Sequence, residues 1–269
     1  MAMLLALMAL AIVLFLLMTG AWWLSLKTGQ SGWVDTIWSL GTGLFGALAA
    51  LVPLDPADLA IGPTARQILI ALFCAAWGAR LAFHIGSRTK GSTDDPRYAK
   101  LKETWGDDYR LQMFLFLQTQ AIAAFVLDTA CLIAAHARGA LSYVDGLAIV
   151  ILLIALGGEG IADFQLRRFK ANSQNRGQIC DVGLWSWSRH PNYFFEWLIW
   201  CAFALPALSD PIAYPTGAFA LLAPVMMYVL LVHVSGIPPL EAHMQASRGE
   251  RFDRYKARVS AFWPMPPRD

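Results

Sequence analysis

Long apolar stretches alternate with short polar ones along almost the whole chain. Seven of them are long enough to cross a membrane as helices, namely residues 3–26, 34–52, 65–85, 113–135, 143–164, 193–208 and 212–234. The sixth is short, so it must begin within residues 185–187 or lie low in the bilayer. The pattern predicts an all-α, polytopic membrane bundle of about seven transmembrane helices.

Composition supports a membrane protein and excludes several other classes. Of the 269 residues, 57% are hydrophobic and only 15% are charged, well below the roughly 25% of soluble domains. The loops are too short to hold a large soluble domain. The net charge of +2 is too small to indicate nucleic-acid binding. The four cysteines are scattered without a CxxC motif, so no metal site is expected.

The basic residues orient the predicted bundle. With the N-terminus outside, all but three of the 21 Lys and Arg residues fall in inner loops and the tail. The exceptions are Arg66, Arg80 and Arg138. An excess of basic residues on one side marks the cytoplasmic face, so the C-terminus is expected in the cytoplasm.

A polar cluster interrupts the apolar pattern where the sixth segment begins. In GLWSWSRHPNYFFEWLIW, residues 183–200, the polar residues Arg189, His190, Asn192 and Glu196 lie among aromatic ones. Asn192 and Glu196 are four apart and share one face of a helix. They are costly to bury unless something pairs with them. The cluster could cap a helix that starts at Pro191, but the spacing favours a ligand site.

The second and third segments carry further candidates. Asp35 lies just inside the second apolar run, where it either caps the helix or has a buried role. In the third segment, Trp77, Arg80, His84 and Arg88 form one stripe at helical spacing. Arg80 could snorkel to the interface. A stripe of three basic groups better suits an anionic ligand in a cavity.

The inner end of the fifth segment resembles a site for phosphate and ribose in its chemistry. Asp163 and Arg167 are four apart and could form only a local ion pair. However, Arg168 and Asn172 follow at once. Arginine binds phosphate oxygens bidentately and a carboxylate accepts from ribose hydroxyls, so this stretch is a candidate nucleotide site.

Two other inner segments complete the candidate site. Tyr98 follows a proline in the charged loop after the third segment and could help close the cytoplasmic mouth. The tail after the seventh segment predicts an amphipathic basic helix with Glu241, His243, Arg248 and Tyr255. Such a helix could close over a ligand or attach to anionic membrane lipid, and the two roles are compatible.

The motifs resemble those of a known family. SRHPNYFFEW, with the preceding ADFQLRRFK and the basic tail, resembles the steroid 5-alpha-reductase C-terminal domain superfamily. DTIWSLG, WGARLAFHIGSR, DDPRYAKL and FLFLQTQ are closer still to a bacterial, largely uncharacterised branch. The resemblance implies an integral protein of the bacterial inner membrane that binds NADPH from the cytoplasm. It also implies reduction of an activated C=C bond in a lipophilic, steroid-like or isoprenoid enone.

The resemblance also implies roles for individual residues. Asn192 and Glu196, with Tyr193 adjacent, would bind the nicotinamide side of NADPH, and residues of the preceding helix end and the tail would hold the rest. The full set expected around the cofactor is Arg80, Arg88, Asp163, Arg167, Arg168, Asn172, Arg189, His190, Asn192, Tyr193, Glu196, Glu241, His243, Arg248 and Tyr255. Residues 1–110 would serve the substrate and residues 111–269 the cofactor.

The sequence departs from the family on the substrate side. Steroid reductases use a Glu in the second helix and a Tyr in the third to polarise the ketone. This chain has Asp35 and the stripe around His84 near those places, and Phe195 where relatives often have Gly. We expect a protonated Asp35 or His84, together in one cavity, to donate to the carbonyl oxygen. Tyr98 is the next candidate.

Two other functions remain compatible with the sequence. One is an S-adenosylmethionine-dependent membrane methyltransferase of the isoprenylcysteine type, which shares the RHP motif. Asn192 and the arginines placed for phosphates argue against it, because a sulfonium cofactor does not need them. The other is a non-enzymatic lipid-binding or scaffold protein, which a tightly retained nucleotide would exclude.

Overall fold

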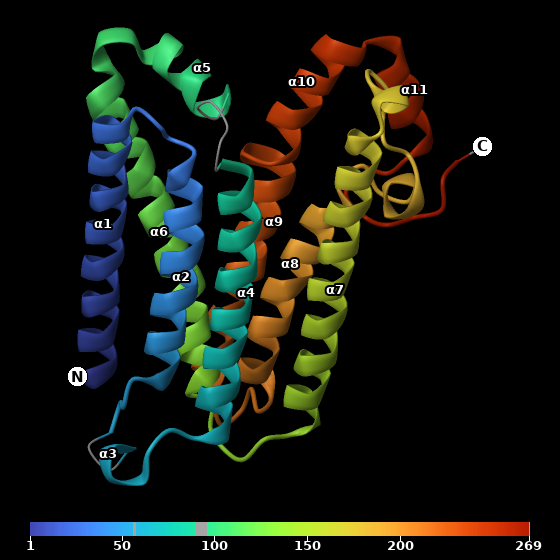
Figure 1. Ribbon diagram of the computed structural model, residues 1–269. Helices are drawn as coiled ribbons and strands as arrows, with labels where there is room; N and C mark the ends of the chain where they lie inside the picture. The colour runs from blue at the N-terminus through green and yellow to red at the C-terminus, as the bar shows by residue number, and fades with distance from the viewer. Residues whose placement is uncertain (56–57, 90–95, 269) are drawn as a thin grey trace. The chain divides into compact units, whose positions relative to one another are not determined.

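The computed structural model describes residues 1–55, 58–89 and 96–268, which form helices and one isolated β-bridge (Figure 1). The longer helices are α1 (Ala2–Thr28), α2 (Trp33–Leu51), α4 (Ala65–Thr89), α5 (Pro96–Trp105), α6 (Tyr109–Ala135), α7 (Tyr143–Ala171), α8 (Pro191–Ala204), α9 (Leu222–Val229), α10 (Ile237–Arg248) and α11 (Glu250–Arg258). Short helices are α3 (Asp58–Ile61), η1 (Gly106–Asp108), η2 (Ser173–Asn175), η3 (Gly183–Ser186), η4 (Leu205–Leu208), η5 (Pro215–Leu221) and the π-helix η6 (Leu230–Val234).

Six helical stretches of the described chain are long and apolar enough to cross a membrane, so an all-helical integral membrane protein is confirmed. The predicted count of seven is not. The missing segment is α8, which has 14 residues and is therefore about 21 Å long, against roughly 30 Å of hydrocarbon. It begins at Pro191, after the residues 185–187 that a full span would need, and a proline is suited to the first turn of a helix. At its other end it passes into the 3₁₀ turn η4.

The chain forms two compact units. Unit 1 comprises Met1–Ser142 and Pro206–Leu222, and unit 2 comprises Tyr143–Leu205 and Ala223–Asp269. Helix α6 packs on α1 and α2 within unit 1. The division of roles expected between residues 1–110 and 111–269 stays a prediction.

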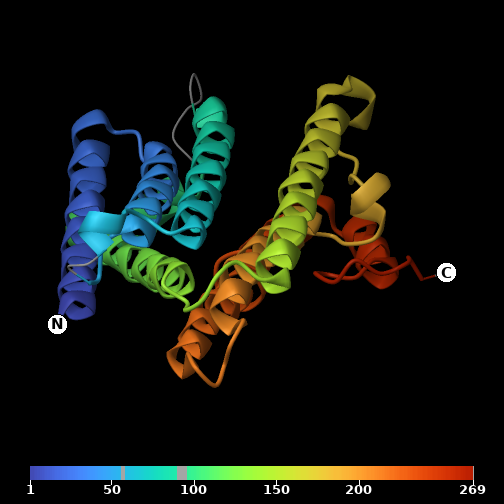
Figure 2. The same cartoon turned by 90° about the horizontal axis from the view of Figure 1, so that it is seen from below.

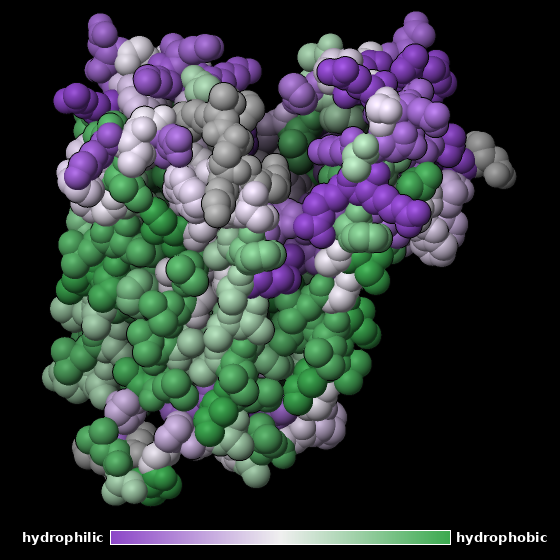
Figure 3. Space-filling model, in the orientation of Figure 1, coloured by the Kyte–Doolittle hydropathy of each residue, from purple (hydrophilic) through white to green (hydrophobic). Residues whose placement is uncertain are grey.

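Unit 1 is a bundle of α1, α2, α4 and α6, which lie side by side in Figures 1 and 2. The closest pair is α2 and α4, where Gly43 faces Gly78. A Cβ atom on Gly43 would lie 2.6 Å from the Cα of Gly78, so only small residues permit this approach. Over this unit, Figure 3 shows hydrophobic residues along the helix walls and hydrophilic ones gathered at the end with α5.

Arg66 explains one exception to the charge pattern of the loops. Its side chain is 3% exposed. The guanidinium donates hydrogen bonds to the carbonyls of Ala137 at 2.7 Å, Arg138 at 3.2 Å, Gly139 at 3.0 Å and Ala140 at 2.8 Å. This cation fixes the loop after α6 and is not a free surface charge.

Unit 2 is built on the packing of α7 against α8, with α10 and α11 joined at Gly249. Gly249 has a φ of 51°, in the left-handed region that glycine adopts without strain. The apolar face of α11, Phe252 and Tyr255, is buried with Val259 against Ile179 and Met244. The apolar residues of α11 are therefore used in packing within unit 2.

Candidate functional site

In unit 1, Asp35 is the centre of a polar group at the start of α2. The hydroxyl of Tyr98 donates a hydrogen bond to Asp35 Oδ1 at 2.7 Å. The guanidinium of Arg97 pairs with Oδ2 of the same carboxyl group. Both carboxyl oxygens therefore act as acceptors. The single hydroxyl proton of Tyr98 is thus bound to Asp35 in this structure. The sequence analysis expected Asp35 or His84 to donate to a substrate carbonyl, with Tyr98 as the next candidate, and that assignment stays a prediction.

Tyr98 is held rigidly by apolar packing. It is 3% exposed and lies in a cluster with Met18, Val34 and Met113. Its ring meets that of Phe116 edge-on, with the centroids 6.4 Å apart. The phenol thus presents its hydroxyl at the edge of an apolar core, a surrounding that strengthens a hydrogen bond to an incoming oxygen.

His84 lies on α4, which packs against α2, the helix of Asp35. Helix α4 approaches α2 at Gly86 and Thr89: a Cβ on Gly86 would contact Thr36, and the Thr89 hydroxyl donates to the Gly32 carbonyl. His84 is seven residues after Trp77, so the two lie on nearly the same side of α4. A cavity shared by His84 and Asp35 stays a prediction.

Two other members of the α4 stripe, Trp77 and Arg80, place side-chain atoms in the protein interior. Trp77 is 1% exposed and its ring meets that of Trp38 edge-on at 6.2 Å. The Nε and Nη2 atoms of Arg80 are buried, so its guanidinium points into protein and does not snorkel to the interface. The side chain of Arg88 lies outside the described part of the structure.

In unit 2, Arg189, His190 and Glu241 bind one another. Arg189 Nε and Nη2 donate to Glu241 Oε1 at 2.7 Å and Oε2 at 3.2 Å. His190 Nε2 lies 3.1 Å from the same Oε1, and its ring stacks on Tyr193 with the centroids 5.6 Å apart. Arg189 Nη1 also donates to the carbonyl of Val259. These groups are largely satisfied by the protein itself and act as a frame for α8.

Asn192 differs from its neighbours. It is the second residue of α8 and is half-buried. Within the described residues its side-chain amide has no hydrogen-bond partner. An amide without a protein partner at the start of a helix is available to water or to a ligand.

Glu196 lies one turn further along the same face of α8 and is only 7% exposed. It accepts a hydrogen bond from Trp200 Nε1 at 3.0 Å, so it already has a structural role. The neighbouring Phe195, a departure from the family pattern, fills the space beside Gly158 of α7, where its ring occupies the position of a Cβ. A glycine on α7 thus accommodates the larger residue on α8.

Near the C-terminal end of α7, a buried acid is followed by exposed arginines. Asp163 is 8% exposed, whereas Arg167 and Arg168 are exposed. Asn172 is used differently from expectation, because its side chain accepts a hydrogen bond from Gln174 N at 3.0 Å and caps the turn η2.

The tail residues divide into structural and available groups. Tyr255 is buried and donates to the carbonyl of Trp185 at 2.6 Å, so it holds the fold together and does not face a ligand. Burial, and to a smaller extent the nearby Cys180, raises the pKa of Tyr255. His243 is exposed, and Nε of Arg248 is buried without a hydrogen-bond partner in the described chain.

The sequence analysis missed Ser188, Trp185 and the C-terminal segment. Ser188 is fully buried, and Trp185 Nε1 bonds the Ala162 carbonyl at 3.0 Å. Neither has a periodic signal, because both lie in the loop before α8. The only hint was their position next to the RHP motif.

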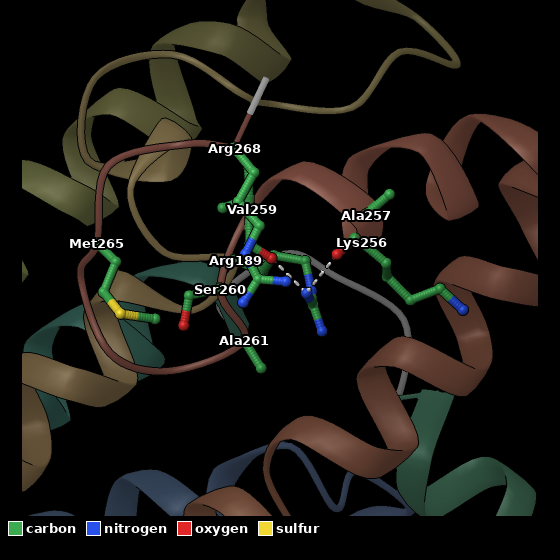
Figure 4. Close-up of a pocket in the computed structure, with 8 residues that line it drawn as sticks. All are labelled: Arg189, Lys256, Ala257, Val259, Ser260, Ala261, Met265 and Arg268. Atoms are coloured by element: carbon green, nitrogen blue, oxygen red, sulfur yellow. Dashed lines mark hydrogen bonds between the residues drawn. The ribbon is translucent and has the colours of Figure 1, made fainter.

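One pocket of about 250 Å³ opens beside this loop in unit 2 (Figure 4). Its walls include Arg189, Lys256, Ser260, Met265 and Arg268. It is smaller than the roughly 300–1,000 Å³ of sites for drug-sized ligands, so it is at most part of a dinucleotide site. Across the described residues no group of three His, Cys, Asp or Glu side chains could hold a metal ion.

Comparison with known proteins gives a family without an assigned activity. Residues 21–259 match the model of the family described as "Protein of unknown function (DUF1295)". The match covers most of the chain, so the protein belongs to this family. No curated protein matches the sequence.

Proposed function

We propose that this DUF1295 protein is a membrane-embedded, NADPH-dependent reductase of an activated C=C bond in a lipophilic enone. The observation that carries the proposal is Asn192. Arg189, His190 and Glu241 bind one another and hold the start of α8. Asn192 lies between this group and the buried Glu196 in the sequence. Its side-chain amide has no hydrogen-bond partner in the described chain. A carboxamide such as that of nicotinamide matches its donors and acceptor.

The charges of unit 2 favour a dinucleotide. Arg167 and Arg168 are exposed beside the buried acid Asp163, and Lys170 and Arg176 follow in the same stretch. Arginines bind phosphate oxygens, and a buried carboxylate accepts from ribose hydroxyls. More arginines are present than a pyrophosphate uses, which favours NADPH over NADH.

The proposed acid is Tyr98. When bound, NADPH supplies a hydride for the β-carbon of the enone. On substrate binding, the Tyr98 hydroxyl would turn from Asp35, to which it donates at 2.7 Å in the free protein, and donate to the carbonyl oxygen of the substrate. There it would stabilise the charge that develops as the C=C electrons move toward the oxygen. The proton added at the α-carbon to complete the saturated ketone would come from solvent. A protonated Asp35 or His84 is the alternative donor.

The proposed location is the bacterial inner membrane, with the N-terminus outside and the site open to the cytoplasm. Its support is the placement of basic residues, since the end of unit 1 that carries α5 also collects the hydrophilic residues (Figure 3). The binding of Arg66 to loop carbonyls accounts for a cation on the other side. The bilayer would concentrate a lipophilic substrate, and the cytoplasm would supply the nucleotide.

Ligand binding tests the proposal directly. The purified protein in lipid nanodiscs is titrated with NADPH, NADH and S-adenosylmethionine while its unfolding temperature is followed, and retained small molecules are identified by mass spectrometry. Stabilisation by NADPH beyond that by NADH is expected. Stabilisation by S-adenosylmethionine alone would instead favour a methyltransferase, and no response to any nucleotide would favour a lipid-binding protein.

A further inference from the structure

A C-terminal segment, residues 259–268, is bound along the loop that leads into α8, and we call it the strap. The backbone N–H of Arg189 donates to the Ser260 carbonyl at 2.8 Å, within a parallel bridge between Ser188 and Ser260. Further along, the N–H of Met265 donates to the Trp187 carbonyl at 3.0 Å. Figure 4 shows the strap curving past Arg189. The strap is therefore paired with this loop through the main chain.

Aromatic packing anchors the middle of the strap in unit 2. Phe262 is 3% exposed. Its ring lies 5.8 Å from Phe194, 5.9 Å from Trp197 and 5.4 Å from Tyr228 between centroids, and all three contacts are edge-on. Edge-on aromatic pairs add stability beyond the area they bury. The strap is thus fixed to α8 and to the α9–η6 segment as well as to the loop.

One buried hydroxyl links the strap to the first turn of α8. Ser188 is 0% exposed. Its Oγ donates to the carbonyl of Phe262 at 3.0 Å and accepts from the N–H of His190 at 3.1 Å. A hydroxyl has one proton to donate and lone pairs to accept, so both contacts are made by the same oxygen at the same time.

His190 is the N-cap residue of α8, and its side chain makes no capping hydrogen bond. Its carbonyl accepts from the N–H groups of Tyr193 at 3.1 Å and Phe194 at 3.2 Å, and its imidazole Nε2 lies 3.1 Å from Glu241 Oε1. Its backbone N–H donates to Ser188 Oγ. Asn192 is two residues further on, so its direction depends on how His190 is fixed.

We propose that Ser188 is a positioning residue of the cofactor site, and that it sets the direction of Asn192 by coupling the strap to the first turn of α8. This inference rests on the proposed function, because the consequence it names is nucleotide binding. It assigns the strap a role in that site, although no strap side chain need touch the cofactor.

The test is a double-mutant cycle on the full-length protein in nanodiscs. The variants are Ser188→Ala, Phe262→Ala and the two combined. Ser186→Ala is the matched control, because the Ser186 hydroxyl bonds only the nearby Gly183 carbonyl. NADPH affinity and hydrogen exchange of the amides of residues 189–194 are measured for each.

Ser188→Ala is expected to weaken NADPH binding roughly tenfold, the order expected for one lost buried hydrogen bond, and to speed exchange at residues 189–194. Ser186→Ala should change neither. Because Ser188 acts through the strap, the double variant should bind NADPH no more weakly than the worse single variant. Additive losses, or unchanged exchange in Ser188→Ala, would overturn the proposal.

The exchange measurement separates this inference from the proposed function. If the unaltered protein binds no NADPH, the reductase proposal fails. Exchange then decides the coupling alone: faster exchange at residues 189–194 in both Ser188→Ala and Phe262→Ala upholds it, and unchanged exchange overturns it.

Discussion

Replacing Asn192 by alanine separates a ligand-binding role from a structural one. The amide has no hydrogen-bond partner in the described chain, so its removal breaks no contact in the free protein. Alanine is also the better helix former, by up to about 0.7 kcal/mol in a helix interior. The free Asn192→Ala protein is therefore expected to unfold within about 2 °C of the unaltered one, since 1 kcal/mol shifts the midpoint by roughly 2–4 °C at this chain length.

The expected effect on NADPH binding is much larger. Without the Asn192 amide, polar groups of a bound carboxamide would be left without partners in a largely water-excluded site. Such a loss costs roughly 1–3 kcal/mol, or about five- to 150-fold in affinity. Without NADPH, the variant should therefore be as stable as the unaltered protein. With NADPH, its unfolding temperature should rise less.

Glu196→Ala provides the contrast. Glu196 is 7% exposed and accepts from Trp200 Nε1 at 3.0 Å. Its loss removes this acceptor from a buried indole N–H, at about 1–3 kcal/mol, so this variant should be destabilised even without ligand. The contacts of the two residues therefore predict different outcomes for two variants on the same face of α8.

The assay is NADPH titration followed by unfolding temperature, with Gln118→Ala as the amide control. Gln118 donates to Thr19 at 3.3 Å within unit 1 and has no proposed role in binding, so its variant should bind NADPH normally. If Asn192→Ala unfolds several degrees lower yet binds NADPH as tightly as the unaltered protein, the amide is structural and the argument for the cofactor site fails.

Three further changes test other parts of the structure. Tyr98→Phe should lower enone turnover by about 10²–10⁴-fold, the usual worth of a positioned acid, with NADPH affinity within a few fold; NADPH oxidation in nanodiscs measures it, and normal turnover would contradict the role. Glu241→Leu leaves buried Arg189 without its counter-charge, at roughly 3–5 kcal/mol, so the unfolding temperature should fall by several degrees. Burial raises the pKa of Tyr255, so its contribution to stability is complete below about pH 10 and is lost as the pH rises further. Tyr255→Phe should be less stable at pH 8 but lose less stability between pH 10 and 11.5, and an equal alkaline loss in both proteins would contradict this.

The membrane helices could be predicted because each apolar run is by itself long enough to indicate a spanning helix. The exception is α8, whose length was overestimated. The apolar run extends through Leu208, but the helix ends at Ala204, where the chain enters a 3₁₀ turn. Arg66 was an exception to the charge pattern that the sequence did not explain, because its four carbonyl partners lie some 70 residues away. Partners at that separation leave no periodic signal.

For the candidate site, sequence spacing identified the residue types but not how they are used. Asp35 and Tyr98 were both candidates, yet their direct hydrogen bond joins residues 63 positions apart. His84 was grouped with Asp35 because the two helices were expected to share a cavity. The closest approach of α2 and α4 is at Gly43 and Gly78, where two small residues let the backbones meet. A stripe of polar residues does not show by itself where two helices approach most closely.

The RHPN stretch shows why a polar motif has to be interpreted through its partners. Arg189 and His190 are the charged residues that attract attention, but their hydrogen bonds go to Glu241 and to the strap. A group satisfied by the protein can bind a ligand only if it first gives up those contacts, at the cost of leaving a buried partner unpaired. Asn192 carries no such cost. The physical argument for a ligand site therefore rests on the least charged member of the motif, and the charged members explain why that residue can be held in place to bind.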